Sequence, residues 1–71
     1  MKNWFKIELT NGAYWWIRSS RGWVGLIPHI AKLSNEPRCN GATVRSATWA
    51  EGLMCAIRYY ILGDDVNCTE V

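Results

Sequence analysis

Residues 4–18, WFKIELTNGAYWWIR, decide the fold of this chain because they predict a β-hairpin. Two segments rich in β-branched and aromatic residues flank Asn11-Gly12, and an Asn-Gly pair in this setting favours a two-residue type I′ turn. Such a turn places Ile7 opposite Trp16. One face of the hairpin is then almost purely apolar and forms the expected core, and its residues are Phe5, Ile7, Leu9, Tyr14 and Trp16.

The opposite face of the predicted hairpin carries aromatic rings beside charged side chains, so it is the candidate partner-binding surface. Exposed Trp rings are typical anchors of protein interfaces, and rings beside basic groups also stack nucleic-acid bases. The candidate binding residues are Trp4, Lys6, Trp15, Ile17, Arg18 and Arg21. We expect Trp15 to be exposed in the monomer, or covered by a second copy in a homodimer. The alternative is that residues 28–33 or the chain end cover this face and bury its rings.

Beyond the hairpin, the sequence predicts further strands. Residues 20–22 predict a turn and residues 23–27 a third strand. Residues 28–33 suit either an edge strand or the first turn of a short helix, because Pro28 is tolerated in both. Residues 34–41 predict a loop, and the short β-branched segment 42–46 predicts a final strand. The expected sheet is therefore small and antiparallel, with three to four strands.

Residues 48–62 predict a single C-terminal helix. Thr48 and Glu51 form a capping box, and Gly63 is placed to end the helix in the left-handed conformation. Apolar residues recur behind the cap at helical spacing and form one stripe, Trp49, Leu53, Ile57, Tyr60 and Ile61. We expect this helix to pack on the core face of the sheet, with Leu53, Ile57 and Ile61 buried against Phe5, Ile7 and Trp16. The predicted fold class is α+β, with two layers.

The size and composition of the chain predict one small domain over residues 1–63, followed by a polar tail over residues 64–71 that frays. The chain has 71 residues, five of them Trp, and a net charge of +2. No uninterrupted apolar run approaches the ~20 residues of a membrane span, so no membrane partner is expected. The start has no apolar signal segment, and three widely spaced cysteines suit neither a disulfide framework nor a zinc site. These features predict a reducing, cytoplasmic location.

No catalytic, cofactor-binding or metal-binding motif is recognisable in the sequence. His29 is the only histidine, and no nucleophile or carboxylate is placed by sequence to form a triad with it. Asp64 and Asp65 follow the predicted helix, where acidic residues are usually just solvated. The chain also has no glycine-rich phosphate loop. We therefore expect a protein without enzymatic activity, cofactor or metal.

The layout of the whole chain resembles that of small phage and prophage accessory proteins, among them anti-CRISPR inhibitors. The shared features are a single short aromatic domain, a β-hairpin start, a terminal helix and no catalytic apparatus. The resemblance implies a protein that occludes a host complex in the cytoplasm of a bacterial cell. The leading hypothesis is thus a non-enzymatic protein-binding module. The alternative is a single-stranded nucleic-acid-binding protein that uses the aromatic and basic sheet face.

Overall fold

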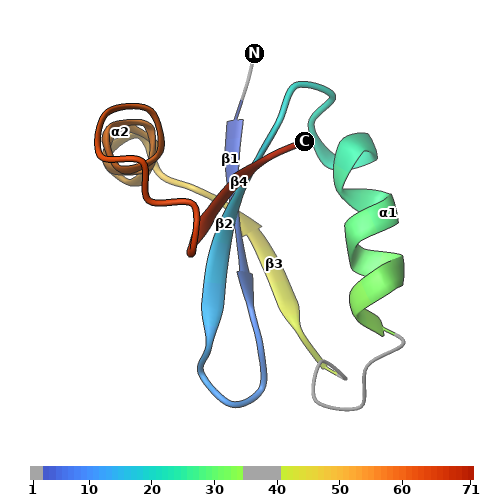
Figure 1. Cartoon of the computed structure of the whole chain (residues 1–71). Helices are drawn as coiled ribbons and strands as arrows, with labels where there is room; N and C mark the ends of the chain where they lie inside the picture. Colours follow the sequence, from blue (N-terminus) through green and yellow to red (C-terminus); the bar gives the residue numbers. More distant parts are fainter. Residues whose placement is uncertain (1–2, 35–40) are drawn as a thin grey trace.

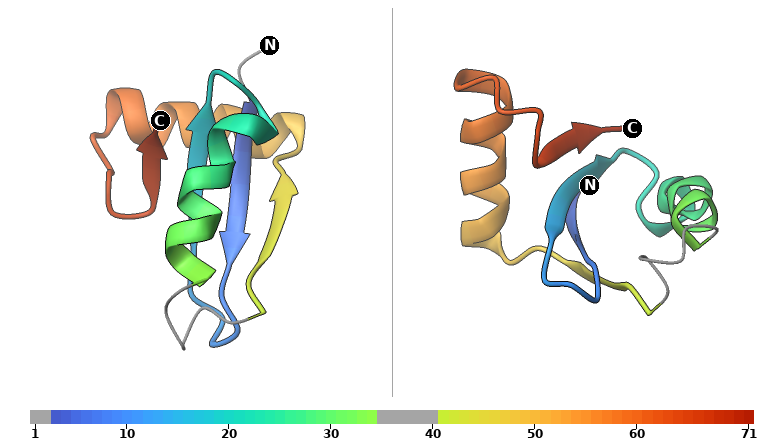
Figure 2. Two further views of the ribbon diagram at one scale, coloured as in Figure 1. Left: turned by 90° about the vertical axis from the view of Figure 1, so that its right-hand side faces the viewer. Right: turned by 60° about the horizontal axis from the view of Figure 1, so that its bottom comes forward.

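The computed structural model describes residues 3–34 and 41–71, which form a four-stranded sheet with a helix on each side (Figures 1 and 2). Along the chain the elements are β1 (Asn3–Glu8), β2 (Tyr14–Ser19), α1 (Trp23–Ser34), β3 (Thr43–Ser46), α2 (Trp49–Ala56), the π-helical turn η2 (Ile57–Ile61) and β4 (Cys68–Glu70). The strand order is β3-β1-β2-β4. The predicted α+β class is confirmed, but the sheet is mixed and the helices number two among the described residues.

The hairpin forms as predicted, but its register differs by one residue from the expected one. Ile7 lies opposite Trp15 rather than Trp16. The Leu9 amide donates to the Ala13 carbonyl oxygen at 2.7 Å, so the loop has three residues, and its last residue, Gly12, has φ +86°. The Ala13 amide donates to Asn11 Oδ1 at 3.0 Å. In a two-residue turn this amide would instead donate to a backbone carbonyl oxygen, so the side-chain hydrogen bond disfavours that turn. A three-residue loop that ends in a left-handed glycine is the next most common hairpin connection.

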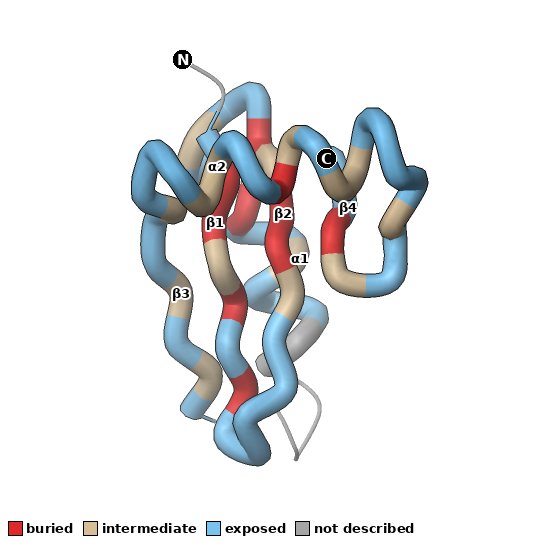
Figure 3. Tube along the Cα trace, turned by 90° about the vertical axis from the view of Figure 1, so that its left-hand side faces the viewer, coloured by how far each residue is buried: buried red, intermediate tan, exposed pale blue. Residues whose placement is uncertain are grey.

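The change of register turns every side chain of β2 to the other face of the sheet, since side chains alternate along a strand. Two cores result in place of the one expected. The core under α1 contains Phe5, Ile7, Ile17 and Leu26, with Trp15 and Val44 packed against it. The core under α2 contains Trp4, Trp16, Cys55 and Cys68, with Ala47 and Tyr59 packed against it. Figure 3 shows that the buried residues concentrate on the central strands, with the outer helix surfaces exposed.

The predicted third strand over residues 23–27 is wrong, because these residues begin α1. Apolar residues recur here at helical spacing, at Trp23, Leu26, Ile27 and Ile30, and this signal outweighs the β-propensity of single residues. The helix lies so close to the sheet that a Cβ on Gly25 would stand 2.1 Å from Ser19 Oγ. Pro28 lies inside the helix rather than in its first turn.

The predicted C-terminal helix and its capping box are confirmed. The Glu51 amide donates to Thr48 Oγ1 at 3.3 Å, and the Thr48 amide donates to Glu51 Oε1 at 3.0 Å. The helix continues through η2, and Gly63 follows with φ +69°, as expected for a left-handed cap.

The polar tail predicted over residues 64–71 contains a strand. β4 pairs in parallel with β2, and the Trp16 amide donates to the Asn67 carbonyl oxygen at 2.6 Å. Because β2 and β3 both run antiparallel to β1, β3 and β4 point the same way, and α2 is the crossover that joins them. The edge of β2 that the predicted third strand would have occupied is taken by the end of the chain. Part of the predicted loop, residues 35–40, lies outside the described residues, and the final strand expected over 42–46 is confirmed as β3.

Candidate functional site

The side of α2 that points away from the sheet is largely apolar. Its exposed side chains, which we call the α2 outer face, are Trp49, Leu53, Met54, Ile57 and Ile61. Trp49 is 84% exposed and Ile61 is 75% exposed. The inward side of α2 is apolar as well, and the charged residues Glu51 and Arg58 only border the outer face. A helical segment with two apolar sides is typical of helices that are covered on both sides. In the isolated chain this helix is covered on one side only (Figure 1).

The stripe predicted from the sequence is therefore real, but it points to solvent and not to the sheet. The expected burial of Leu53, Ile57 and Ile61 against Phe5, Ile7 and Trp16 is wrong, because Ile57, for example, is 42% exposed. The reason is the register of the hairpin, which puts the Trp4 and Trp16 rings on the α2 side. These large rings pack against Cys55 and Tyr59 on the inward side of the helical segment, so the apolar stripe lies on the other side.

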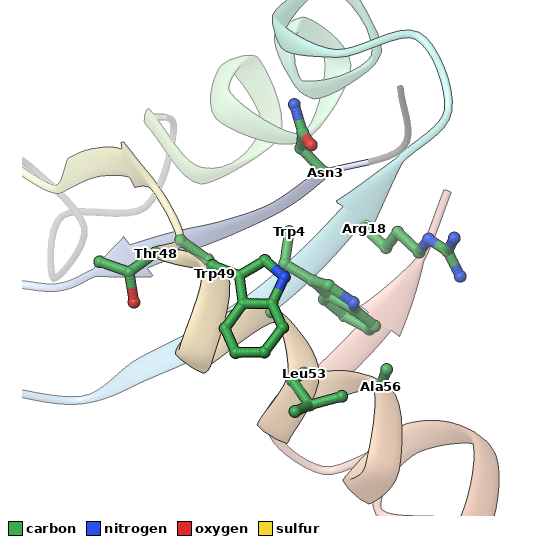
Figure 4. Close-up of a pocket in the computed structure, with 9 residues that line it drawn as sticks. Asn3, Trp4, Arg18, Thr48, Trp49, Leu53 and Ala56 are labelled. Carbon is green, nitrogen blue, oxygen red and sulfur yellow. The ribbon is translucent and has the colours of Figure 1, made fainter.

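A pocket of about 430 Å³ opens beside the first turns of α2 (Figure 4). It is lined by Asn3, Trp4, Arg18, Ala47, Thr48, Trp49, Gly52, Leu53 and Ala56. Trp49 and Leu53 belong both to this pocket and to the α2 outer face, so the two features are continuous. Apolar pockets with a polar edge of this size accept an anchoring side chain or a small ligand.

Two ion pairs hold the charged groups that border the α2 outer face. Arg45 forms a bidentate pair with Glu51, with N–O distances of 2.8 and 2.9 Å. Arg58 Nη2 lies 2.8 Å from Asp64 Oδ2. The hydrogen bond from Arg58 lowers the pKa of Asp64. Both arginines are thus paired with carboxylates within the chain, and the exposed character of this surface is mainly apolar.

A hydrogen-bonded chain of three side chains ties the second half of the helical segment to the sheet. Arg18 Nη1 donates to the Tyr60 hydroxyl oxygen, and the Tyr60 hydroxyl donates to Glu70. The Arg18 guanidinium also lies 5.2 Å from the centre of the Tyr60 ring. Burial and the hydrogen bond to Glu70 raise the pKa of Tyr60. These contacts connect β2, η2 and β4, and they fix the position of the helix on the sheet.

The pKa of Glu51 leads to a prediction about acid stability. The hydrogen bond from Arg45, followed by that from the Thr48 amide, lowers the pKa from its ordinary value of 4.5 to about 2. A carboxyl whose pKa is lower in the folded state stabilises the fold above pH 4.5 and loses this effect as the pH falls toward 2. Thermal melts between pH 2 and pH 6 should therefore show a falling melting temperature, and Glu51→Gln should reduce this fall. Glutamine keeps the capping geometry but does not titrate. An equal fall in the wild type and the variant would contradict the assignment.

The structure separates the residues predicted to form one binding surface. Trp4 is 5% exposed beneath α2, whereas Trp15 is half-buried on the α1 side of the sheet. The expected face shared by Trp4 and Trp15 is therefore wrong, and so is the expectation of a largely exposed Trp15. The alternative, that residues 28–33 or the chain end cover both rings on one face, is met only in part, because α1 covers Trp15 whereas α2 covers Trp4 on the other side of the sheet.

The remaining predicted binding residues lie apart from one another or contact other side chains of the chain. Ile17 is fully buried under α1. Lys6 is half-buried, pairs with Glu8 at 3.2 Å and lies 4.5 Å from the centre of the Tyr14 ring. Arg18 donates a hydrogen bond to the Tyr60 hydroxyl oxygen. Of the six, Arg21 is the one with an exposed side chain, and it borders a separate pocket near α1.

A second apolar surface lies on the other helix. The outward side of α1 exposes Trp23, Val24 and Ile27, but Trp23 makes an edge-to-face contact with Phe5 at 4.7 Å. Trp23 lines neither the pocket beside α2 nor the pocket near Arg21. The α2 outer face is therefore the stronger candidate. Sequence reasoning found its residues through their helical spacing but assigned them to the core.

Within the described residues, no helix has the length and apolar composition needed to cross a membrane. The same residues contain no group of three or more His, Cys, Asp or Glu side chains that could hold a metal ion. No protein family model, no curated protein and no solved structure matches this chain.

Proposed function

We propose that this chain is a non-enzymatic protein-binding module whose contact surface is the α2 outer face together with the adjoining pocket. The observation that supports this most strongly is Trp49, which is 84% exposed at the start of a helix whose outward side chains are nearly all apolar. Soluble monomers rarely expose a contiguous apolar surface of this kind unless it has a partner.

The exposed Trp49 ring is suited to anchor a partner, and it lies next to a pocket of this chain that can receive a side chain of that partner. Tryptophan is the residue most enriched among those that dominate binding energy, because its large ring is buried completely in a complex. The pocket between Trp49, Leu53 and Trp4 offers a place for a side chain of the partner. A partner that covers the α2 outer face would bury the anchor and fill the pocket in one contact.

The chemistry of the surface indicates what kind of partner it takes. Arg45 and Arg58 beside it are paired with Glu51 and Asp64, which leaves Arg18 of the pocket, hydrogen-bonded to Tyr60, as the positive charge that a polyanion would meet. A helix that presents an apolar stripe fits an apolar groove on another protein. The alternative of single-stranded nucleic-acid binding required Trp4, Lys6 and Trp15 on one open face, and that face is divided between two cores.

The layout resemblance adds a narrower proposal about the identity of the partner. Small phage accessory proteins act by occluding a host complex, and a compact domain with one rigid apolar helix face is suited to that role. We propose a component of a bacterial host complex as the partner. This step rests on the layout of the chain, while the contact surface rests on the exposure of α2.

Trp49→Ala should weaken partner binding at least about 30-fold without unfolding the chain. Loss of an exposed aromatic anchor typically costs at least 2 kcal/mol of binding free energy, or about 30-fold in affinity. The measurement is a quantitative pull-down from bacterial lysate with wild type and variant, followed by titration with the purified partner. Circular dichroism should show the same fold for both, because the Trp49 ring contributes little to either core.

Ile61→Ala and Ile27→Ala form a matched pair of controls, since both are exposed isoleucines on a helix. Ile61 belongs to the α2 outer face and its truncation should weaken binding, whereas truncation of Ile27 on α1 should not. Equal retention of the partner by the wild type and Trp49→Ala would contradict the proposed surface. If the chain forms a dimer that Trp49→Ala dissociates, the surface is correct but its occupant is a second copy, and the host-complex proposal fails.

A further inference from the structure

Two cysteines from distant parts of the sequence lie side by side in the core under α2. Cys55 lies in the last turn of α2 and Cys68 begins β4, and both side chains are 0% exposed. They belong to the same buried cluster as Trp4 and Trp16. The sequence alone indicated no such pair, because Cys55 and Cys68 are brought together by the crossover from α2 to β4.

The pair joins the shortest strand of the sheet to the main body of the fold. β4 has three residues and is held at the edge of β2, next to the end of the chain. Short edge elements at a chain terminus open more easily than the rest of a fold. A covalent bond between Cys55 and Cys68 would prevent β4 from opening independently of α2.

We propose that Cys55 and Cys68 form a reversible disulfide that locks β4 onto α2 when a small disulfide oxidant is present. The Cys68 thiolate attacks one sulfur of the oxidant, which forms a mixed disulfide and releases the first small thiolate. The Cys55 thiolate then attacks the Cys68 sulfur, which forms the Cys55–Cys68 bond and releases the second small thiolate. Two protons leave the cysteine thiols, and the two electrons lost by the protein reduce the oxidant to two thiols. A dithiol reductant reverses both steps.

Burial controls when this reaction takes place. Loss of solvation raises the pKa of the Cys55 thiol to about 12 and also raises the pKa of Cys68. Because the thiolate is the reactive form, both thiols are unreactive while β4 is closed. Opening of β4 exposes Cys68 to the oxidant and reduces the burial of Cys55, so the Cys55 thiolate attacks the mixed disulfide before β4 closes. The rate of bond formation therefore follows the opening of β4, and the bond then blocks that opening.

The test uses a Cys39→Ser chain, in which the thiols of Cys55 and Cys68 are the only ones. Incubation with oxidised glutathione under native conditions should remove both free thiols, with a mass that fits the loss of two hydrogens and no attached glutathione. Closing a loop of this length should raise the melting temperature by about 10 °C, and dithiothreitol should reverse the shift. Hydrogen exchange of the β4 amides should slow in the oxidised chain.

Cys55→Ser and Cys68→Ser in the same background are the controls, since each removes one partner with little change in volume. Cys55→Ser should accumulate a glutathione adduct on Cys68 in place of the internal bond. Two persistent free thiols after prolonged oxidation, or glutathione on both cysteines of the parent chain, would overturn the proposal. A bond that forms only in denaturant, or that leaves β4 exchange unchanged, would also overturn it. The experiment does not depend on the proposed partner-binding function.

Discussion

Ile17→Ala should remove between about two fifths and all of the free energy of unfolding of the chain. Ile17 is 0% exposed and lies in the core under α1, where it contacts Phe5, Ile7 and Leu26. Truncation of a buried isoleucine to alanine leaves a cavity and typically costs about 2–5 kcal/mol. A domain of this size has about 5 kcal/mol of stability in total. Chemical denaturation followed by circular dichroism measures the change.

Ile57→Ala is the matched control for this prediction. Ile57 was expected to be buried from the helical stripe, but the structure leaves its side chain 42% exposed on the α2 outer face. Its truncation should change the free energy of unfolding by much less than that of Ile17. If Ile57→Ala proved as destabilising as Ile17→Ala, α2 would have to face the sheet in the orientation that the sequence predicted.

Trp4→Ala should cost about 3–5 kcal/mol and release α2 from the sheet. The Trp4 ring is buried between β1 and the helical segment, and its centre lies 5.9 Å from that of Tyr59. Removal of the ring leaves Trp16, Cys55 and Cys68 in the core under α2 and takes away the ring that Tyr59 packs against. The free energy of unfolding and the far-ultraviolet circular dichroism of the variant measure this effect.

Trp49→Ala is the corresponding control, because Trp49 lines the same pocket but is exposed to solvent. Its truncation should leave stability nearly unchanged while it weakens partner binding. The two tryptophans thus separate the role of the α2 core from that of the α2 outer face. A stable and fully helical Trp4→Ala variant would contradict the burial of this ring beneath α2.

The features that depend on short sequence signals were predictable. The hairpin follows from Asn11-Gly12 between two β-rich segments, and the start of α2 follows from the capping box of Thr48 and Glu51. Gly63 ends the helix as expected, with a positive φ. Each of these features depends on residues a few positions apart, so the physical cause is contained in the local sequence.

The features that depend on register and on distant contacts were not predictable in the same way. Asn11-Gly12 fits both a two-residue and a three-residue loop, and the choice between them decides which face of β2 is buried. The shift by one residue moves Trp16 from the α1 side of the sheet to the α2 side. The predicted partner-binding surface disappears with it, and the apolar stripe of α2 is left without a place in the core.

Two secondary-structure elements, α1 and β4, were also not predicted from the sequence. Residues 23–27 carry β-favouring side chains, but the helical spacing of Trp23, Leu26 and Ile27 places them on α1. Cys68 and Glu70 belong to a polar segment with no strand pattern, and they pair because the edge of β2 is free and α2 returns the chain to it. The local helical spacing therefore decided the first case, and tertiary contacts decided the second.

The most direct test of this account is a set of proton–proton contacts measured by nuclear magnetic resonance in the isolated chain. The structure predicts cross-strand contacts between Ile7 and Trp15, ring contacts between Trp4 and Tyr59, and no contact from Leu53 to the Phe5 ring. This pattern would show that α2 turns Cys55 and Tyr59 inward and leaves its outer face free for a partner. Contacts between Ile7 and Trp16 together with contacts between Leu53 and Phe5 would contradict it, because the apolar stripe would then lie in the core.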